Sequence, residues 1–307
     1  MAEIINFFGQ SQNYKEGRRN IDVISFLPKL KYLNGETMVI SIDEKMLADN
    51  RLLESFLREV LLMKYVGVSV VLVVDIRGEV NKYLYENSGI GDRLDNDVAV
   101  SVEKDYDVVD VLIKHNGLNT IYDIMDNLGA NVLAVSGSTL GIKMADIGSD
   151  EFLPFEKDRK NFNNVGLKNK NSKSSVGLLD EILKTDIIPV ISPIVRDFQG
   201  VNYVMEGKYF SARLAGLLGA LKCVITYSDE KKIPKGCVYG AEHIIDVVNE
   251  GGYSANFLNI AKASADAITN GTQGVHIINP KIVDLVEELC SGNFFGIFVY
   301  DDAVSHL

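Results

Sequence analysis

The stretch "GVSVVLVVD", residues Gly67–Asp75, is an almost unbroken apolar run that ends in a carboxylate. Such a run is typical of a parallel strand that is buried on both faces of a sheet. A strand is also predicted before it, at "TMVISI", residues Thr37–Ile42, which leads directly into the polar residues 43–45. Between the two strands, Leu47–Tyr65 carries apolar residues at helical spacing. The order strand, helix, strand predicts a parallel sheet with helices packed on it.

The same alternation continues through the rest of the chain and predicts an α/β fold, a three-layer α/β/α sandwich around a mostly parallel sheet. Ligands of such sheets bind outside the carboxyl ends of the strands. The polar turns expected there are Asp43–Lys45, Asp75–Glu79, Ser136–Gly141 and Ser228–Glu230. The further strands are predicted at residues 130–137, 186–194, 222–229, 274–280 and 293–300, and the further helices at Val80–Tyr85, Tyr106–Leu128, Phe210–Leu221, Ala255–Ile268 and Ile282–Leu289.

Composition narrows the class of protein. The 307 residues are 47% hydrophobic and 24% charged, and no apolar run approaches the ~20 residues of a membrane span. The N-terminus lacks the pattern of a signal peptide, and the three cysteines show no zinc-site spacing, so a cytoplasmic protein is expected. The net charge of −11 argues against a nucleic-acid partner.

One segment, Phe155–Ser175, is polar and locally basic within this acidic chain. The simpler interpretation is a solvated hairpin or mobile loop. The alternative is a basic lid over an anionic ligand.

A series of stretches occurs in an order and at a spacing known from one family. They are "GETMVISI", "YVGVSVVLVVDIRGEVN", "LGANVLAVSGSTLG", "NVGLK", "TDIIPVISPI", "GLLGALKCVITYSD", "NEGGY" and "GVHIINP". On these stretches, from about Phe26 to Tyr300, the chain resembles the amino acid kinase family, and most closely acetylglutamate kinase and the kinase-like domain of N-acetylglutamate synthase.

The resemblance implies two lobes and a homo-oligomer, a dimer or a hexamer. Residues 35–195 would form the N-terminal lobe, with the acyl-amino-acid substrate and the main dimer contact. Residues 196–307 would form the C-terminal, nucleotide-binding lobe. Residues 1–34 resemble a helical extension that interlaces dimers into hexamers in some members. The alternative is a helix packed on its own subunit.

The resemblance also implies ATP and Mg²⁺ chemistry, in which lysines, backbone N–H groups and a metal hold the phosphates. The family has a lysine at the end of its first strand, followed by two glycines. Here the corresponding residues are Ser41, Asp43 and Glu44, with Lys45 two residues beyond the glycine pair. Ser41 is a nucleotide-site candidate by position, and Lys45 is a catalytic candidate if the protein is active.

After its second strand the family has three glycines, which bring backbone N–H groups to the substrate and phosphates. This chain has Asp75, Ile76 and Arg77 there, followed by Gly78. A side chain restricts the close backbone approach that glycine permits. Arg77 and Gly78 are substrate-site candidates.

Two further motifs depart from the family. The arginine that grips the substrate's α-carboxylate corresponds to Ala99, with Arg93 nearby but out of register. The Asn-x-Asn-Ala-Asp motif corresponds to "MEGKY", Met205–Tyr209, so its organising aspartate becomes Tyr209. Arg93 and Lys208 are retained as substrate-site candidates.

Other positions match the family's turns. Ser136 and Gly137 are candidates for the substrate site, and Asp229, Gly251 and Gly252 for the nucleotide site. Lys262 is the first lysine after the last glycine pair and the second catalytic candidate if the protein is active. These glycines could equally be kept for backbone geometry alone.

Three hypotheses follow. The first is an acetylglutamate-kinase-like protein with degenerate phosphate loops, weak or inactive as a kinase. It would act as a binding, regulatory or assembly subunit, with a link to arginine biosynthesis and an amino-acid-like ligand. The second is a divergent active kinase that uses Lys45, Arg77, Lys208 and Lys262 in new positions to phosphorylate the side-chain carboxylate of N-acetylglutamate or a related amino acid. The third is the kinase-like half of an N-acetylglutamate synthase. No metal site is assigned, although Asp43, Glu44 and Asp75 could supply oxygen ligands for Mg²⁺ or Ca²⁺.

Overall fold

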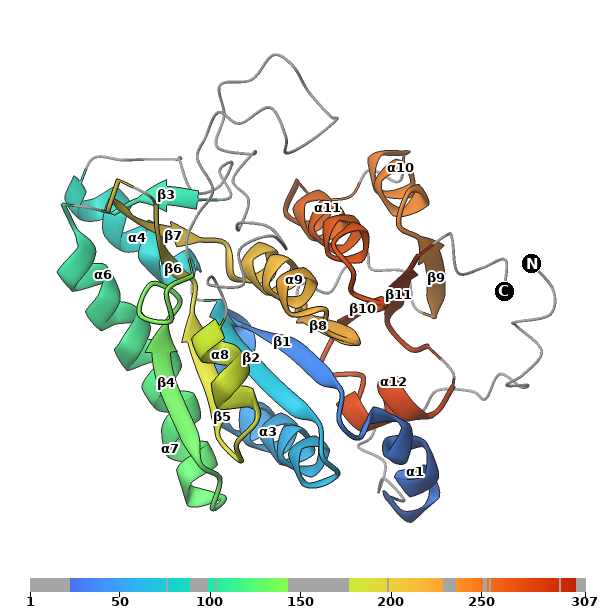
Figure 1. The fold of residues 1–307 in the computed structure, drawn as a ribbon. Coiled ribbons are helices and arrows are strands. Elements are labelled where there is room, and N and C mark those ends of the chain that lie inside the picture. Colours follow the sequence, from blue (N-terminus) through green and yellow to red (C-terminus); the bar gives the residue numbers. More distant parts are fainter. Residues whose placement is uncertain are drawn as a thin grey trace.

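A central eight-stranded sheet organises the molecule, with strand order β4-β5-β2-β1-β8-β10-β11-β9 (Figure 1). The computed structural model describes residues 23–75, 77–88, 99–102, 104–142, 177–197, 199–228, 236–250, 253, 255–292 and 294–301. The strands are β1 Thr37–Asp43, β2 Ser69–Asp75, β4 Val132–Ser136, β5 Ile188–Ser192, β8 Lys222–Thr226, β9 Cys237–Gly240, β10 Gly274–Ile278 and β11 Ile297–Tyr300.

Strand direction and register position the candidate site. The six strands from β4 to β10 are parallel, whereas β11 runs antiparallel to β10 and pairs in parallel with β9. In the β1–β2 pair, Asp43 lies opposite Asp75. Two acidic residues that are far apart in the sequence therefore stand side by side at the carboxyl ends of adjacent central strands.

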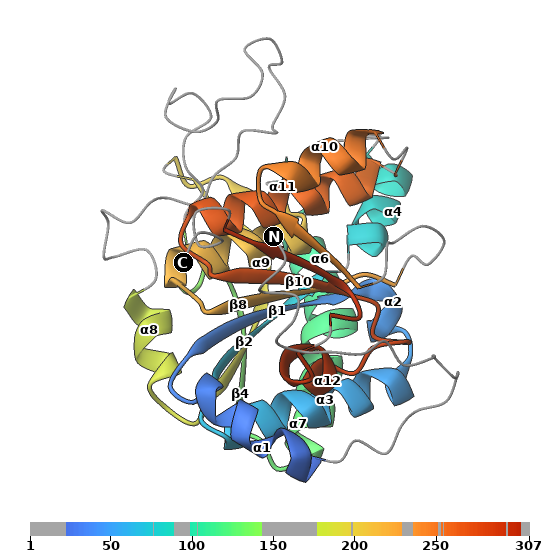
Figure 2. The same cartoon turned by 90° about the vertical axis from the view of Figure 1, so that its right-hand side faces the viewer.

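Helices cover both faces of the sheet, which Figure 2 shows nearly edge-on. The helices α9 Gly207–Leu218, α10 His243–Glu250 and α11 Ala255–Thr269 lie on one face. The helices α1 Val23–Leu30, α3 Asn50–Tyr65, α7 Asn119–Asn127 and α12 Leu285–Cys290 lie on the other. The buried residues form one apolar cluster on each face. The three-layer α/β/α fold predicted from the sequence is confirmed.

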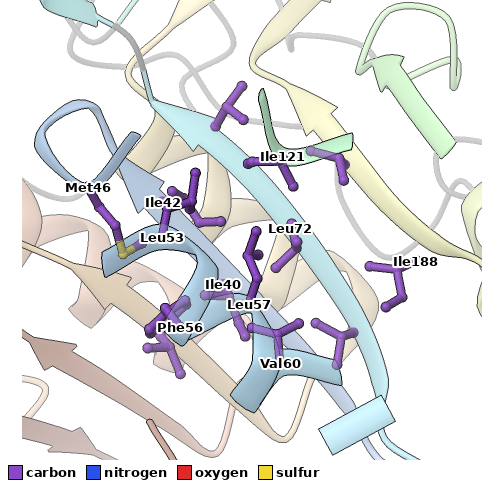
Figure 3. Packing of buried hydrophobic residues seen from close by; sticks show 14 of the residues in the cluster. Ile40, Ile42, Met46, Leu53, Phe56, Leu57, Val60, Leu72, Ile121 and Ile188 are labelled. Carbon is purple, nitrogen blue, oxygen red and sulfur yellow. The ribbon is translucent and has the colours of Figure 1, made fainter. Parts of the chain in front are cut away.

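Packing of α3 on β1 and β2 shows why this sequence gives these layers (Figure 3). Apolar residues at positions 53, 56, 57 and 60 form one stripe of α3 and are all buried. They pack against alternate residues of the two strands, among them Ile40, Ile42 and Leu72. Asp49 starts the helix, because its side chain accepts the N–H groups of residues 51 and 52.

A small antiparallel sheet stands beside the central one, in the order β3-β7-β6. Its strands are β3 Ala99–Ser101, β6 Ile194–Arg196 and β7 Asn202–Met205. Because β7 ends at Met205 and α9 begins at Gly207, this sheet delivers the chain to the start of α9. The sequence patterns did not predict it, since β3 and β6 are each three residues long.

Several predicted boundaries were wrong. The helix predicted at Leu47–Tyr65 is α2 Glu44–Leu47 followed by α3, since Asp49 caps a new start. The helix predicted at Val80–Tyr85 is α4 Arg77–Ser88. The helix predicted at Phe210–Leu221 begins three residues earlier, as α9, and ends at Leu218, because Gly219 has a left-handed φ of 59°.

The helix predicted at Tyr106–Leu128 is interrupted. It consists of α6 Tyr106–Ile113, a π-helical turn η3 at Lys114–Leu118, and α7. Three further elements, α8 Gly177–Leu183, β9 and α10, were not predicted. Of the predicted extension 1–34, residues 1–22 lie outside the described residues, as does the basic segment Phe155–Ser175. In the described part of the chain, no helix is long and apolar enough to cross a membrane.

Candidate functional site

The candidate site is formed where the start of α9 meets the carboxyl ends of β1 and β2. The strand ends contribute Asp43 and Asp75, the start of α4 contributes Arg77 and Gly78, and α9 contributes Lys208. Every second residue of β1 and β2 points toward α9, and Asp43 and Asp75 are among these residues. The site therefore lies at the edge of the sheet where ligands of this fold class bind.

Asp75 is bound by two donors from the first turn of α9. Its Oδ2 lies 2.7 Å from Lys208 Nζ, and its Oδ1 accepts the Gly207 N–H at 3.2 Å. Burial by itself would raise the pKa of Asp75, but the Lys208 ammonium outweighs burial and brings that pKa below its usual value. Burial likewise opposes the charge on Lys208, yet Asp75 and Glu206 raise its pKa to about 12. Both groups are therefore charged at neutral pH.

Gly207 makes this close approach possible. A Cβ at position 207 would lie 2.5 Å from Asp75 Cβ and 2.8 Å from Asp75 Cα. Any other residue would push the start of α9 away from β2. Because the glycine allows contact, the N-terminus of α9 holds an internal carboxylate where a helix N-terminus can hold an external anion.

Asp43 is a second internal carboxylate, bound by backbone groups of two elements. Its Oδ1 accepts the Met46 N–H at 2.8 Å, which caps α2. Its Oδ2 accepts the Ser228 N–H at 2.7 Å, and the Ser228 hydroxyl donates to the same carboxylate. The Asp43 N–H in turn donates to Thr226 Oγ1. The carboxylate thus ties the end of β1 to the turn after β8.

Two more acidic side chains, Glu44 and Glu206, lie beside these aspartates. Glu44 Oε2 accepts the Gly78 N–H at 2.8 Å, and burial, followed by nearby Glu79 and Asp75, raises the pKa of Glu44. Glu206 Oε2 lies 3.2 Å from Arg77 Nη1. Burial raises the pKa of Glu206 more than the two cations lower it.

Several hydrogen-bond donors at this edge are paired with carboxylates of the chain. The N–H groups of Met46, Gly78, Gly207 and Ser228 all donate to carboxylates of the chain itself, and Lys208 is paired with Asp75. The remaining charge at this edge is acidic, which repels phosphate. Within the described ranges no group of three or more His, Cys, Asp or Glu residues is placed to hold a metal ion. The three carboxylates considered for Mg²⁺ or Ca²⁺ point instead at N–H or ammonium donors.

The other candidate residues lie outside this cluster or inside the packed fold. Ser41 is fully buried in β1. Ser136 Oγ accepts the Thr139 N–H and closes the turn after β4. Gly137 is in close contact, since a Cβ there would lie 2.9 Å from Ile194 O. Both residues of this turn have structural roles in the observed contacts.

Lys45 and Lys262 are both exposed, on α2 and α11 respectively. Ala99 is the first residue of β3. Arg93, Asp229, Gly251, Gly252 and Ile76 lie outside the described residues.

Tyr209, at the position of the family's organising aspartate, belongs to a hydrogen-bond network separate from the Asp75–Lys208 pair. Its hydroxyl accepts hydrogen bonds from Arg213 Nε and Nη2, and Arg213 forms an ion pair with Asp266 of α11. The phenol is buried, which raises its pKa. Tyr209 therefore fastens α9 to α11.

The sequence identified Lys208 and the polar turn that begins at Ser228, but not the carboxylates that bind them, and it did not single out Glu206. The available signal was the pattern "EGKY" immediately after a strand, which places a lysine in the first turn of a helix. Lys208, in the first turn of α9, is a lysine at this strand edge, and its ammonium group is paired with Asp75.

Comparisons with known proteins agree with this fold. The amino acid kinase family profile matches residues 36–279. Acetylglutamate kinase of Thermoanaerobacter pseudethanolicus is 24% identical over 292 residues, which cover 91% of this chain and 94% of that protein. Acetylglutamate kinase of Kosmotoga olearia is 24% identical over 264 residues, 84% of this chain and 88% of that protein.

Solved structures show the same fold. N-acetylglutamate synthase from Neisseria gonorrhoeae, complexed with coenzyme A and N-acetyl-glutamate, superposes with a TM-score of 0.69 at 14% identity. The match covers 91% of this chain but 63% of the synthase, so this chain spans less than two thirds of that protein. Carbamate kinase from Giardia lamblia bound to AMP-PNP gives a TM-score of 0.56 at 12% identity, covering 87% of this chain and 99% of that one. The chain belongs to the amino acid kinase family.

Proposed function

We propose that this protein is an acetylglutamate-kinase-like member of the family that does not phosphorylate N-acetylglutamate at a useful rate. It would act as a binding, regulatory or assembly subunit, with an amino-acid-like ligand and a link to arginine biosynthesis. The observation that carries the proposal is the pairing of Asp75 with Lys208 and the Gly207 N–H. The donors at the start of α9 already hold an anion.

Electrostatics support the proposal. A carboxylate about 4 Å from a phosphate charge costs about 4 kcal/mol at an effective dielectric constant of 20. Asp43, Glu44 and Asp75 all lie at this edge, where Lys208 is paired with Asp75 and Arg77 with Glu206. A phosphoryl group would have to displace carboxylates that are covalently part of the chain and so present at high effective concentration.

Loss of preorganised donors has a large effect on phosphoryl transfer. Removing one such donor from an enzyme typically costs about 10²–10³ in kcat. Here the donors have carboxylate partners in the described structure, so several are withheld together. Even two losses would leave little of a typical turnover of about 10 s⁻¹.

The test is ADP release from Mg²⁺ATP with N-acetylglutamate as the acceptor. We expect turnover below about 0.01 s⁻¹ at pH 7.5, with Lys45→Ala and Lys262→Ala variants indistinguishable from the parent. Saturable turnover above about 1 s⁻¹ that either substitution abolishes would overturn the proposal. It would establish the divergent-kinase hypothesis, in which these exposed lysines reach the phosphates.

A second candidate, the kinase-like half of an N-acetylglutamate synthase, is favoured by the fold match over 91% of this chain. The synthase of N. gonorrhoeae has been captured with N-acetyl-glutamate and with L-arginine. This candidate predicts that one of these two compounds raises the melting temperature of the protein while ATP does not. If neither compound does so at 10 mM, the candidate loses its support.

Assembly is part of the proposal. A homo-oligomer predicts a sedimentation mass of at least twice the 33.9 kDa of one chain at micromolar concentration. A mass near 33.9 kDa would contradict an assembly role.

A further inference from the structure

A second group of titratable residues lies on the opposite face of the sheet, beneath α12. Lys222 is the first residue of β8, and its neighbour on β10 is Gly274, which in turn pairs with Tyr300 of β11. These three strands lie side by side in the order β8-β10-β11, and β8 also pairs with β1 (Figure 1). Because β8 is parallel to β1 and begins at Lys222, this lysine lies at the amino ends of the strands, whereas the candidate site lies at their carboxyl ends. Neither the fold nor the proposed function uses this lysine.

Lys222 lies across its neighbouring strand rather than along its own. Its Nζ is 4.5 Å from the ring centroid of Phe298. A Cβ at position 274 would lie 2.8 Å from Lys222 Nζ and 2.5 Å from the Phe298 ring. Glycine at 274 therefore provides the space in which the ammonium and the ring meet.

The Lys222 amine contacts an aromatic ring, and among the described residues it has no close counter-ion. In the part of the chain that the structure describes, no carboxylate lies within 4 Å of Lys222 Nζ. The nearby acid is Glu288, which raises the pKa of Lys222 only in part. By contrast, Lys208 is held by Asp75 and Lys184 by Glu181.

The Glu288 carboxylate is hydrogen-bonded to groups other than Lys222. Its Oε1 lies 2.9 Å from His276 Nδ1, and its Oε2 accepts the N–H groups of Phe295 and Gly296. A carboxylate with these partners stays ionised, and its pKa is lowered although burial opposes this. Among the described residues His276 Nε2 is buried without a hydrogen-bond partner, which fits an imidazole that carries its proton on Nδ1.

We propose that Lys222 is a nucleophilic amine that accepts an acyl group from an activated acyl donor. The Nζ lone pair attacks the carbonyl carbon of a thioester or an acyl phosphate. A C–N bond forms, the C–S or C–O bond to the leaving group breaks, and its electron pair leaves with the thiolate or phosphate. The proton lost from Nζ goes to solvent. The product is a neutral amide at a place where a charge is costly to bury.

The protonation state supports this reactivity. Burial lowers the pKa of Lys222 to about 8, with Glu288 opposing the shift. At pH 7.5 about a quarter of such an amine is neutral, compared with about 0.1% for a lysine of pKa about 10.4. Intrinsic nucleophilicity falls with pKa, by a slope of about 0.4–0.5 for thiols. With a similar slope for amines, the net advantage over an exposed lysine is about tenfold.

The test measures acetylation of each lysine of the intact protein by peptide mass spectrometry at pH 7.5. Acetyl phosphate and acetyl-CoA are used in separate arms, which distinguishes the two classes of donor. We expect Lys222 to react about ten times faster than Lys184, an exposed and ion-paired reference, with Lys208 unreactive. Faster labelling of Lys222 than of Lys184 with either donor supports the proposal and identifies the class of donor. If Lys222 reacts no faster than Lys184 with both donors, the proposal is overturned.

Trace labelling with acetic anhydride between pH 6 and 11 supplies a second readout. The rate at Lys222 should rise with a midpoint near pH 8, and a midpoint near 10 would overturn the proposal. Phe298→Leu removes the ring that attracts the ammonium and should shift the midpoint to lower pH. Lys222→Arg should abolish the fast site and leave the rates of Lys184 and Lys208 unchanged.

Discussion

Replacing Lys208 with methionine should destabilise the fold strongly, because the substitution leaves Asp75 buried without its cation. The attraction across the 2.7 Å pair is about 6 kcal/mol at an effective dielectric constant of 20, and desolvation of both ions offsets much of it. Removing one partner of a buried pair typically costs about 3–5 kcal/mol. The rise of the Lys208 pKa from 10.5 to about 12 corresponds to about 2 kcal/mol. We therefore expect a loss of about 3 kcal/mol at pH 7.

The sign of the pH dependence is fixed by Asp75. In the parent its folded-state pKa is lowered, so its stabilisation is present above the unfolded-state value of 3.8 and lost as the pH falls through the folded-state value. In Lys208→Met burial raises the pKa of Asp75, so protonation relieves the penalty as the pH falls. The difference between the two proteins should narrow between pH 7 and pH 4.

Urea unfolding followed by circular dichroism measures this difference. Lys184→Met is the matched control, since it removes the same side chain from an exposed pair with Glu181 and should leave the free energy of unfolding almost unchanged. A loss at Lys208 no larger than that of the control would refute the claim that Asp75 and Lys208 form a buried pair.

Three further predictions concern the same structure. Gly207→Ala should cost about 1–3 kcal/mol by urea unfolding, because its Cβ would meet Asp75 at 2.5 Å; an unchanged midpoint would contradict the close packing. Asp43→Ala should lower the free energy of unfolding by more than Asp49→Ala, which removes a helix cap worth about 1 kcal/mol. The reason is that Asp43 caps a helix and also binds Ser228. Equal losses would refute the tie between β1 and the turn after β8. Burial lowers the pKa of His276 in the folded protein. As the pH falls below about 6.5, His276 therefore takes up a proton in the unfolded chain before it does so in the folded one, and the folded state loses stability. Between pH 7 and 5, His276→Asn should therefore remove a slope of up to about 1.4 kcal/mol per pH unit from the unfolding free energy, and identical slopes would contradict this.

The fold could be predicted from the sequence because its signals are local. Apolar runs such as Gly67–Asp75 and the helical stripe of α3 specify buried strands and covering helices without knowledge of distant contacts. Boundaries were less accurate where a single cap or glycine decides them, as at Asp49 and Gly219. The π-helical turn at Lys114–Leu118 left no periodicity signal.

The site was harder to predict because its contacts are not local. The acidic residues at the strand ends were visible, but the pairing of Asp75 with Lys208 spans 133 positions. From the sequence, these carboxylates indicated a phosphate loop that had decayed. In the structure they are specific acceptors for α9, α2 and the turn after β8, which explains why the strand edge can be acidic and still packed.

Calorimetry of Mg²⁺ATP binding tests the central claim, that internal carboxylates occupy the anion-binding donors of this fold. The parent protein should give no saturable heat up to 1 mM nucleotide. Asp75→Gly should bind measurably, because it frees Lys208 Nζ and the Gly207 N–H, and adding Lys208→Met to it should remove that binding. Micromolar binding by the parent, or no binding by a folded Asp75→Gly protein, would contradict the account.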